Sequence, residues 1–190
     1  MAKSMILFDL DGTSLTSNGT MLTTTKNIIQ LCKSKGYYIG FITARSRSKK
    51  NRRLLDSLPY DFIAFYNGAV IYVKNQLIES NSLPHQQAFT ILQKLSRDYS
   101  DMVIDVNLEP WFFSSACNEI YRMDSVDRKK CNINNLPKYD VQRIRLRSEQ
   151  VMCISLKKYM SYDSVFYHTS FGNAIIVHKK ANKGYAAQKA

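Results

Sequence analysis

The stretch MILFDLDGTSL, residues 5–15, joins an unbroken apolar run to two closely spaced carboxylates. The apolar residues at its start are typical of a strand covered on both faces. Asp9 and Asp11 follow, with only Leu10 between them. Residues i and i+2 of a strand point the same way about 6.6 Å apart, so two such charges repel unless a cation lies nearby or one is protonated. The stretch therefore predicts a buried strand that ends in a polar site.

Strands and helices are expected to alternate through the first part of the chain. After the opening strand, helices are predicted at residues 23–35 and 47–58, and strands at 37–42 and 61–66. This order and these lengths predict a parallel sheet with right-handed crossovers. In such a sheet, ligands bind at the carboxyl ends of the strands.

Polar residues follow each of these apolar strands, at the edge where a parallel sheet binds ligands. The second strand ends in Thr43 with Arg45, and the third in Asn67 with Gly68. Gly12 lets the backbone after the first strand turn and present amide donors to an anion, and Thr43 adds a hydroxyl donor. For the Asn-Gly pair, a simple turn is an equal alternative. The convergence of these groups predicts a binding site at this edge.

The paired carboxylates suit a divalent cation that works with phosphate. Hard oxygen ligands at this density favour Mg²⁺, which keeps several waters and is bound together with phosphates. One carboxylate of such a pair can attack phosphorus while the other gives and takes protons. A turn explains a lone Asp-x-Asp-Gly motif, but here the charges end a buried strand beside other polar strand ends. An EF-hand loop is excluded because Gly12 comes too early, whereas a metal–nucleotide DxD site of a glycosyltransferase remains an alternative.

A second α/β unit, richer in adjacent strands, is expected after a boundary between residues 80 and 84. We divide the chain into a core at 1–82, an inserted cap at 83–178 and a return to the core at 179–190. Within the cap the patterns predict a helix at 84–99, strands at 102–106, 111–115 and 141–147, and a hairpin over 164–178. Residues 149–160 fit either a strand or a helix, and we favour a helix.

The composition favours anionic partners. The 190 residues are 45% hydrophobic and 22% charged, which permits a buried core, and the formal net charge is +12. The densest basic cluster, residues 45–53, is interpreted mainly as a solvated helix face. The alternating arginines at 143–147 are interpreted as the solvent-exposed face of a cap strand. The alternative is that they attract an anionic substrate. No RNA-binding signature accompanies the aromatic and basic residues of the cap, which argues against nucleic acid as a partner.

The cysteine pattern and the hydropathy of the chain bear on where in the cell the protein is located. Cys32, Cys117, Cys131 and Cys153 are scattered and form no CxxC pair, which argues against a zinc site or a disulfide framework and predicts a cytoplasmic protein. The first apolar stretch is short and runs into Asp9, unlike a secretory signal. The longest apolar runs fall well below the roughly 18 residues that a spanning helix needs, so we expect a soluble protein without a membrane partner.

Four segments resemble the motifs of one known family. Residues 8–13 (FDLDGT) resemble the first motif of the haloacid dehalogenase-like superfamily, most of whose members are Mg²⁺-dependent phosphohydrolases. Residues 41–46 (FITARS) resemble its second motif, in the ATGR form of the Cof-type branch, and residues 66–69 (YNGA) resemble that branch's NGA segment. Residues 182–184 (NKG) resemble the third motif, a lysine in a KG pair. The resemblance spans the whole chain and implies a Rossmann-like three-layer α/β core with an inserted α/β cap.

The resemblance implies four catalytic residues. Asp9 is similar to the nucleophile that becomes a phospho-aspartate, and Asp11 is similar to the general acid/base. Thr43 would hydrogen-bond the phosphoryl oxygens, and Lys183 would offset the charge on Asp9 and the phosphate. Mg²⁺ would be held by the Asp9 side chain and the Asp11 backbone carbonyl.

The resemblance also implies a substrate class. Gly12, Arg45, Asn67 and Gly68 would border a small phosphorylated metabolite, with sugar phosphates as the leading class, and the cap would close over the site and exclude water. Two other functions stay open. One is a non-catalytic phosphate-binding or regulatory module, and the other, ranked third, is nucleic-acid binding through the basic surface. The sequence predicts no particular oligomeric state.

The chain departs from the family pattern near its carboxyl end. The fourth motif, an acidic segment of the GDxxND kind, should follow the lysine by a helix and a strand. Ala190 comes seven residues after Lys183, and residues 179–190 contain no Asp or Glu. A metal ligand and the last core strands are therefore missing from the expected fold. We expect the chain to be part of a longer protein; the alternatives are a natural truncation that binds phosphate without turnover, and a second chain that completes the sheet.

Overall fold

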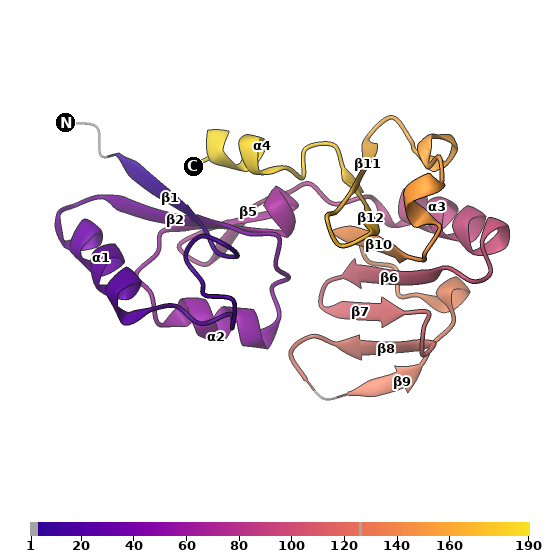
Figure 1. The fold of residues 1–190 in the computed structure, drawn as a ribbon, viewed down its shortest axis with the longest axis horizontal. Coiled ribbons are helices and arrows are strands. Elements are labelled where there is room, and N and C mark those ends of the chain that lie inside the picture. The colour runs from indigo at the N-terminus through magenta and orange to yellow at the C-terminus, as the bar shows by residue number, and fades with distance from the viewer. Residues whose placement is uncertain (1–3, 126) are drawn as a thin grey trace. The chain divides into compact units, whose positions relative to one another are not determined.

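The structure, a computed structural model, describes residues 4–125 and 127–190. It contains two compact units (Figure 1). The first comprises the residues up to Ser80 together with Lys180–Ala190, and the second comprises Asn81–Lys179. None of the helices in the described residues is long and apolar enough to cross a membrane.

The first unit is built on a five-stranded sheet in the order β1-β2-β3-β4-β5. The first three strands run parallel, whereas β4 and β5 each run antiparallel to the strand before them. In Figure 1, α1 and α2 lie below β1 and β2, and α4 lies above them. The predicted α/β fold with a parallel sheet is confirmed. The elements are β1 (Met5–Asp9), α1 (Thr23–Ser34), β2 (Tyr38–Ile42), α2 (Lys49–Asp56), β3 (Phe62–Phe65), β4 (Val70–Val73), β5 (Gln76–Ser80) and α4 (Lys183–Gln188).

The register of the parallel strands brings their carboxyl ends level. Asp9 of β1 pairs with Ile42 of β2, and Ile42 pairs with Ala64 of β3. The strands hold this register because their side chains pack into a buried core, in which Phe41 and Phe62 have no exposed surface. The residues that follow each strand therefore meet at one edge of the sheet.

Two hairpins extend this sheet; the sequence offered the first turn, at Asn67 and Gly68, as one alternative but did not predict β4 or β5. A tight turn over residues 66–68 joins β3 to β4, and a second turn at Lys74 and Asn75 joins β4 to β5. Both residues of the second turn have positive φ, 47° and 65°, as in the primed turns that match strand twist. β5 lies at the end of the sheet and exposes Leu77 and Ile78, so it lacks the alternation that marks a half-buried strand.

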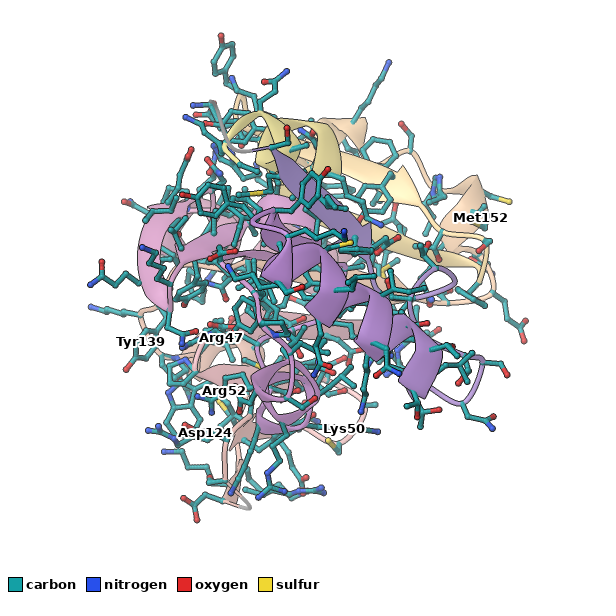
Figure 2. The ribbon with its side chains drawn as sticks, turned by 90° about the vertical axis from the view of Figure 1, so that its left-hand side faces the viewer. Arg47, Lys50, Arg52, Asp124, Tyr139 and Met152 are labelled. Carbon is teal, nitrogen blue, oxygen red and sulfur yellow. The ribbon has the colours of Figure 1, made fainter. Side chains whose placement is uncertain are left out.

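The basic cluster at residues 45–53 does not form a single solvated face. Lys49, Lys50 and Arg53 of α2 are exposed, as expected from the sequence. Arg52 is only half-exposed, and Arg47 precedes the helix. Figure 2 labels Arg47, Lys50 and Arg52 of this cluster. The helix begins at Lys49, two residues after the predicted start, and Ser48 is its cap.

The second unit is a seven-stranded antiparallel sheet in the order β11-β12-β10-β6-β7-β8-β9. α3 packs against it through a buried stripe that includes Ala88, Ile91 and Leu95. The predicted hairpin is present as β11 and β12. The elements are α3 (His85–Asp98), β6 (Val103–Leu108), β7 (Trp111–Ser114), β8 (Glu119–Arg122), β9 (Arg128–Lys130), β10 (Arg143–Arg147), β11 (Ser164–His168) and β12 (Asn173–His178).

The face of this sheet away from its apolar core carries an ion-pair network. β6 alternates, with Ile104 and Val106 in the core and Asp105 on the other face. Asp105 is 2% exposed and accepts hydrogen bonds from Arg145 and Arg147 of the neighbouring β10. Arg145 and Arg147, which were expected to form only a solvated strand face, are therefore paired with a buried carboxylate.

The helix predicted at residues 149–160 is wrong. The structure has two short 3₁₀ turns there, Val151–Cys153 and Lys157–Tyr159. Val151, Leu156 and Tyr159 are the buried anchors of this segment. Their spacings of five and three residues do not fall on one stripe of an α-helix, so packing favours an irregular path.

Candidate active site

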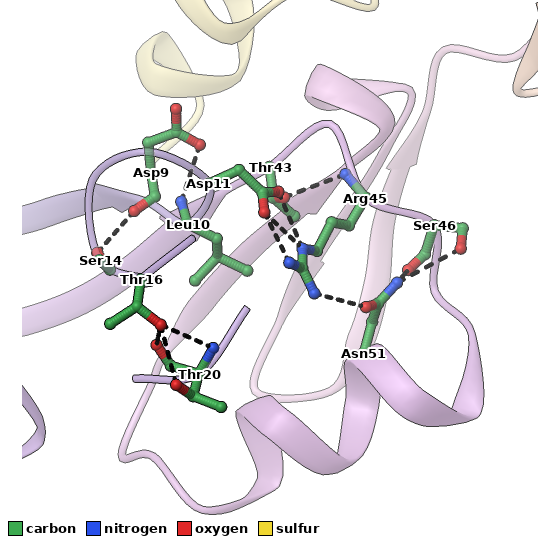
Figure 3. A network of polar contacts seen from close by, with 10 residues as sticks. All are labelled: Asp9, Leu10, Asp11, Ser14, Thr16, Thr20, Thr43, Arg45, Ser46 and Asn51. Atoms are coloured by element: carbon green, nitrogen blue, oxygen red, sulfur yellow. Dashed lines mark hydrogen bonds and ion pairs between the residues drawn. The ribbon is translucent and has the colours of Figure 1, made fainter. Parts of the chain in front are cut away.

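The loop after β1 is folded back on itself (Figure 3). The carbonyl of buried Leu10 accepts hydrogen bonds from the amides of Ser14 and Leu15 at 3.0 and 2.9 Å. The Ser14 hydroxyl donates to the Asp9 carbonyl at 2.6 Å, and the Asp9 Oδ1 atom accepts from the Leu10 amide at 2.8 Å. Gly12 has φ of +73°, and an added Cβ there would meet nothing within 4 Å, so only backbone conformation calls for glycine. The loop fixes the Asp9 carboxylate at the end of the strand.

Lys183 approaches Asp9 from the other end of the chain. It is the first residue of α4, whose cap is the Asn182 side chain accepting from the Tyr185 amide at 2.8 Å. The Lys183 Nζ atom contacts the Asp9 Oδ2 atom, although 174 positions separate the two residues. The Asp9 side chain remains 33% exposed and the Lys183 side chain 46% exposed, so the pair is accessible to a ligand.

Arg45 holds the second carboxylate. Its Nη2 atom lies 2.6 Å from Asp11 Oδ1, and its Nε atom lies 2.9 Å from Asp11 Oδ2. Asn51 of α2 fixes the same guanidinium, since its Oδ1 atom accepts from Arg45 Nη1 at 3.1 Å (Figure 3). Hydrogen bonding from Arg45 lowers the pKa of Asp11, against the opposing effect of burial, and the same contact raises the pKa of Arg45. This arrangement therefore favours the ionised form of Asp11.

Thr43 is fully buried at the end of β2. Its amide donates to the Ala64 carbonyl at 2.9 Å, which ties it to β3. Its Oγ1 atom accepts from the Arg45 amide at 3.1 Å, and the hydroxyl keeps a hydrogen to donate. The threonine thus fixes the backbone that carries Arg45.

The turn at residues 66–68 is strained and locked on two sides. Tyr66 and Asn67 have φ of 51° and 58°, a backbone region that residues other than glycine seldom adopt. Their amides donate to the carbonyls of Arg45 and Thr43 at 3.0 and 2.8 Å, which fastens the turn to the end of β2. Gly68 has φ of +110°, and a Cβ there would lie 3.0 Å from the Asn182 carbonyl oxygen. The close approach of this turn to α4 therefore requires glycine.

Gly68→Ala is expected to lower the free energy of unfolding by about 2–3 kcal/mol, from backbone strain plus the clash with α4. The matched control is Gly36→Ala, because Gly36 also has positive φ, +87°, but open space around it. The control should cost only about 1 kcal/mol in urea unfolding. Equal losses in the two variants would show that α4 does not pack closely on this turn.

All the residues that the sequence assigns to the site lie in the first unit, and the structure brings several into direct contact. Asp9 meets Lys183, Asp11 meets Arg45, and Thr43 bonds the backbone of Arg45 and Asn67. The structure places Gly12 in the loop after β1 and Gly68 against α4. Sequence reasoning missed Asn51 and Ser14, since neither lies in a segment that resembles a family motif.

The donor set offers a place for Mg²⁺. Within residues 4–125 and 127–190, no group of three or more His, Cys, Asp or Glu side chains is arranged to hold a metal. Mg²⁺ needs less protein than that, because it binds one or two carboxylates and completes its shell with water and phosphate. The Asp9 carboxylate is 33% exposed beside Lys183 and fits such a cation, whereas the Asp11 carboxylate is engaged by Arg45.

A family model of haloacid dehalogenase-like hydrolases matches residues 6–190. The chain belongs to this hydrolase family. The phosphatase BT1666 from Bacteroides thetaiotaomicron has a similar structure, with a TM-score of 0.75 at 16% identity, over 98% of this chain and 70% of its own. The subclass IIB sugar phosphatase BT4131 gives a TM-score of 0.72 at 13% identity, over 99% of this chain and 74% of its own. These likenesses show a shared haloacid dehalogenase fold, in agreement with the family match.

One curated relative of this hydrolase-family chain is a phosphomannomutase from Babesia bovis. The two are 29% identical over 97 residues. The matched segment is 50% of this chain and 39% of the length of that protein.

Proposed function

We propose that this chain carries the catalytic site of a phosphatase that hydrolyses a small phosphorylated metabolite through a phospho-aspartate on Asp9. The observation that carries the proposal is the contact between the Lys183 ammonium and the accessible Asp9 carboxylate. A cation at a carboxylate nucleophile offsets the negative charge that builds up when an anionic phosphate approaches. The family match supports a phosphohydrolase rather than another use of such a pair.

The proposed reaction has two steps. In the first, an Asp9 carboxylate oxygen bonds to phosphorus while the bond from phosphorus to the leaving oxygen breaks, and Asp11 donates the proton that makes the leaving group an alcohol. In the second, Asp11 takes a proton from water, whose oxygen bonds to phosphorus as the bond to Asp9 breaks. Inorganic phosphate leaves and Asp9 is restored. The Thr43 hydroxyl would donate to a phosphoryl oxygen throughout.

The Arg45 contact bears on the two roles of Asp11. Because Arg45 favours the charged form, the arrangement in the structure is ready for the step in which Asp11 acts as a base. For Asp11 to act as an acid, its bond to Arg45 must weaken, and an arriving phosphate offers Arg45 another partner. Arg45 would then move from Asp11 to the substrate.

Mg²⁺ is the cofactor that we propose. When bound by the Asp9 side chain and the Asp11 backbone carbonyl, it would supply positive charge to the phosphoryl oxygens. Gly12, Asn67 and Gly68 shape the backbone around the space in which a phosphate would sit.

We further propose that residues 83–178 act as a cap that selects the substrate, inserted in a core formed by 1–82 and 179–190. A phosphorylated sugar is the favoured substrate, since a sugar phosphatase and a phosphomannomutase are among the similar proteins. The cysteines are all free, which supports a cytoplasmic location.

One observation favours a second candidate, a non-catalytic phosphate-binding module. Both carboxylates are already ion-paired, Asp9 with Lys183 and Asp11 with Arg45. Lys183 and Arg45 therefore offset both carboxylates, so a phosphate bound beside them would not need a metal to reduce their repulsion.

A phosphatase assay on the full chain tests the proposal. With p-nitrophenyl phosphate and a panel of sugar phosphates, we expect hydrolysis that needs Mg²⁺, falls when Ca²⁺ replaces it and stops with a chelator. Saturable binding of phosphate without any hydrolysis would replace the phosphatase by the binding module.

Arg45→Gln is expected to raise the pKa of Asp11, because it removes the hydrogen bond and the positive charge that favour the carboxylate. Carbon-13 NMR titration of the aspartate carboxyls measures this directly, and the limb of the pH–rate profile that Asp11 controls should move to higher pH. Arg53→Gln is the matched control, because it removes an exposed charge from α2 and should leave Asp11 unchanged. An unshifted Asp11 in Arg45→Gln would contradict the role of this pair.

A further inference from the structure

A cavity in the first unit, about 400 Å³ in volume, lies between α2 and the strands β3 and β4. Among the residues described, its lining shares none with the Asp9 site: neither carboxylate, Thr43, Arg45 nor Lys183 contributes to it. The volume falls in the range of about 300–1,000 Å³ that is typical of small-molecule sites.

One wall of the cavity is cationic. Lys49, Arg52, Arg53 and Asp56 line it from α2, at the i, i+3, i+4 and i+7 positions that share a helix face. Arg47 joins them from just before the helix, and its guanidinium lies 4.5 Å from the centre of the Tyr72 ring. The lining therefore contains four basic side chains and a single carboxylate, and it favours an anion.

The Arg52 side chain has a hydrogen-bond donor without an acceptor in the described part of the chain. Its Nε atom is buried, and no acceptor for it exists among the residues that the structure describes. A buried donor without an acceptor costs stability, so nearly all such groups in folded proteins are satisfied. The planar fork of an arginine matches the oxygens of a phosphate, and Arg52 is one of the side chains that line the cavity.

The opposite wall is apolar and aromatic. Ile63 and Phe65 contribute from β3, and Tyr60 contributes from the loop before it. The Tyr60 hydroxyl donates to the Asn75 Oδ1 atom at 3.0 Å, which fixes the ring. A rigid aromatic wall facing a cationic one suits a ligand with a flat, weakly polar part joined to a charged part.

We propose that this cavity binds a phosphorylated molecule of the nucleotide class. Its phosphates lie against Arg52 and Arg47, and its ring packs against Tyr60. The site is separate from the proposed phosphatase chemistry and does not depend on it.

Isothermal titration calorimetry of the full chain in EDTA, with ADP, pyrophosphate and adenosine as probes, tests this site. We expect ADP to bind more tightly than either of its parts. Arg52→Ala should weaken ADP binding by about tenfold or more, the usual effect of losing a charged hydrogen bond. Lys50→Ala, which removes a charge from an exposed α2 position outside the cavity lining, should change it by less than about twofold. Thermal unfolding checks that each variant is folded, and Arg52→Lys, which keeps the charge but not the fork, should also weaken ADP binding.

Four results would overturn the proposal: no ADP binding, equal losses in Arg52→Ala and Lys50→Ala, pyrophosphate binding as tight as ADP, or loss of ADP binding in Lys183→Ala. The last result would place the ligand at the Asp9 site instead. Retained binding in Lys183→Ala supports a second site whether or not the chain hydrolyses phosphate esters.

Discussion

Asp9→Asn is expected to reduce phosphatase activity by about 10⁴-fold or more, because an amide cannot serve as the nucleophile that receives the phosphoryl group. The substitution keeps the shape of the side chain and its position beside Lys183. The free energy of unfolding should change by less than about 1 kcal/mol, since the lost ion pair is partly exposed. Steady-state kinetics and urea unfolding measure the two effects.

Asp163→Asn is the control for the loss of one negative charge. Asp163 is half-buried, lies in the second unit and forms an ion pair with Lys179. This variant should keep full activity. If Asp9→Asn retained more than a small fraction of the activity while the fold was intact, Asp9 would not be the nucleophile.

Asp105→Ala is expected to lower the free energy of unfolding of the second unit by about 2–3 kcal/mol. The carboxylate is buried and accepts hydrogen bonds from Ser114 at 2.6 Å, Arg145 at 2.7 Å and Arg147 at 2.9 Å, so its removal leaves these donors without their acceptor. Breaking a fully buried ion pair costs about 3–5 kcal/mol, and the loss here is smaller because both arginines can still reach water. Asp101→Ala, at an exposed position of the same unit, should cost less than about 0.5 kcal/mol. Similar losses in the two variants would show that the network contributes nothing.

The same network predicts a dependence on pH. Burial alone would raise the pKa of Asp105, but hydrogen bonds from Ser114, Arg147 and Arg145 outweigh it and lower the pKa below the ordinary value of 3.8. A carboxyl whose pKa is lower in the folded state stabilises the fold above its unfolded pKa, and this stabilisation is lost as the pH falls through the folded pKa. The wild-type chain should therefore lose stability below about pH 3.8, and Asp105→Ala should lose less over that range.

The sequence predicted the parallel core because its strands are continuous apolar runs that end in polar residues. The register of β1, β2 and β3 then brings Asp9, Thr43 and the turn at residues 66–68 to one edge, as expected for a parallel sheet. β5 could not be predicted, because an exposed strand at the end of a sheet has no buried face to impose alternation.

The polar side-chain pairs between residues far apart in the sequence could not be predicted either. Nothing in the local sequence pairs Asp105 with arginines about 40 positions away, since cross-strand partners depend on which strands become neighbours. Lys183 was assigned only through its resemblance to a family motif, and its contact with Asp9 depends on the close packing of α4 on Gly68.

Chemical mapping of the phosphoryl group shows whether Asp9 is the nucleophile. The full chain is mixed with Mg²⁺ and a hydrolysed phosphate ester, quenched in acid during turnover, and digested for mass spectrometry. We predict one phosphoryl group on the peptide that contains Asp9, absent from Asp9→Asn. Turnover with that peptide unmodified, or with the phosphoryl group on another residue, would contradict the account.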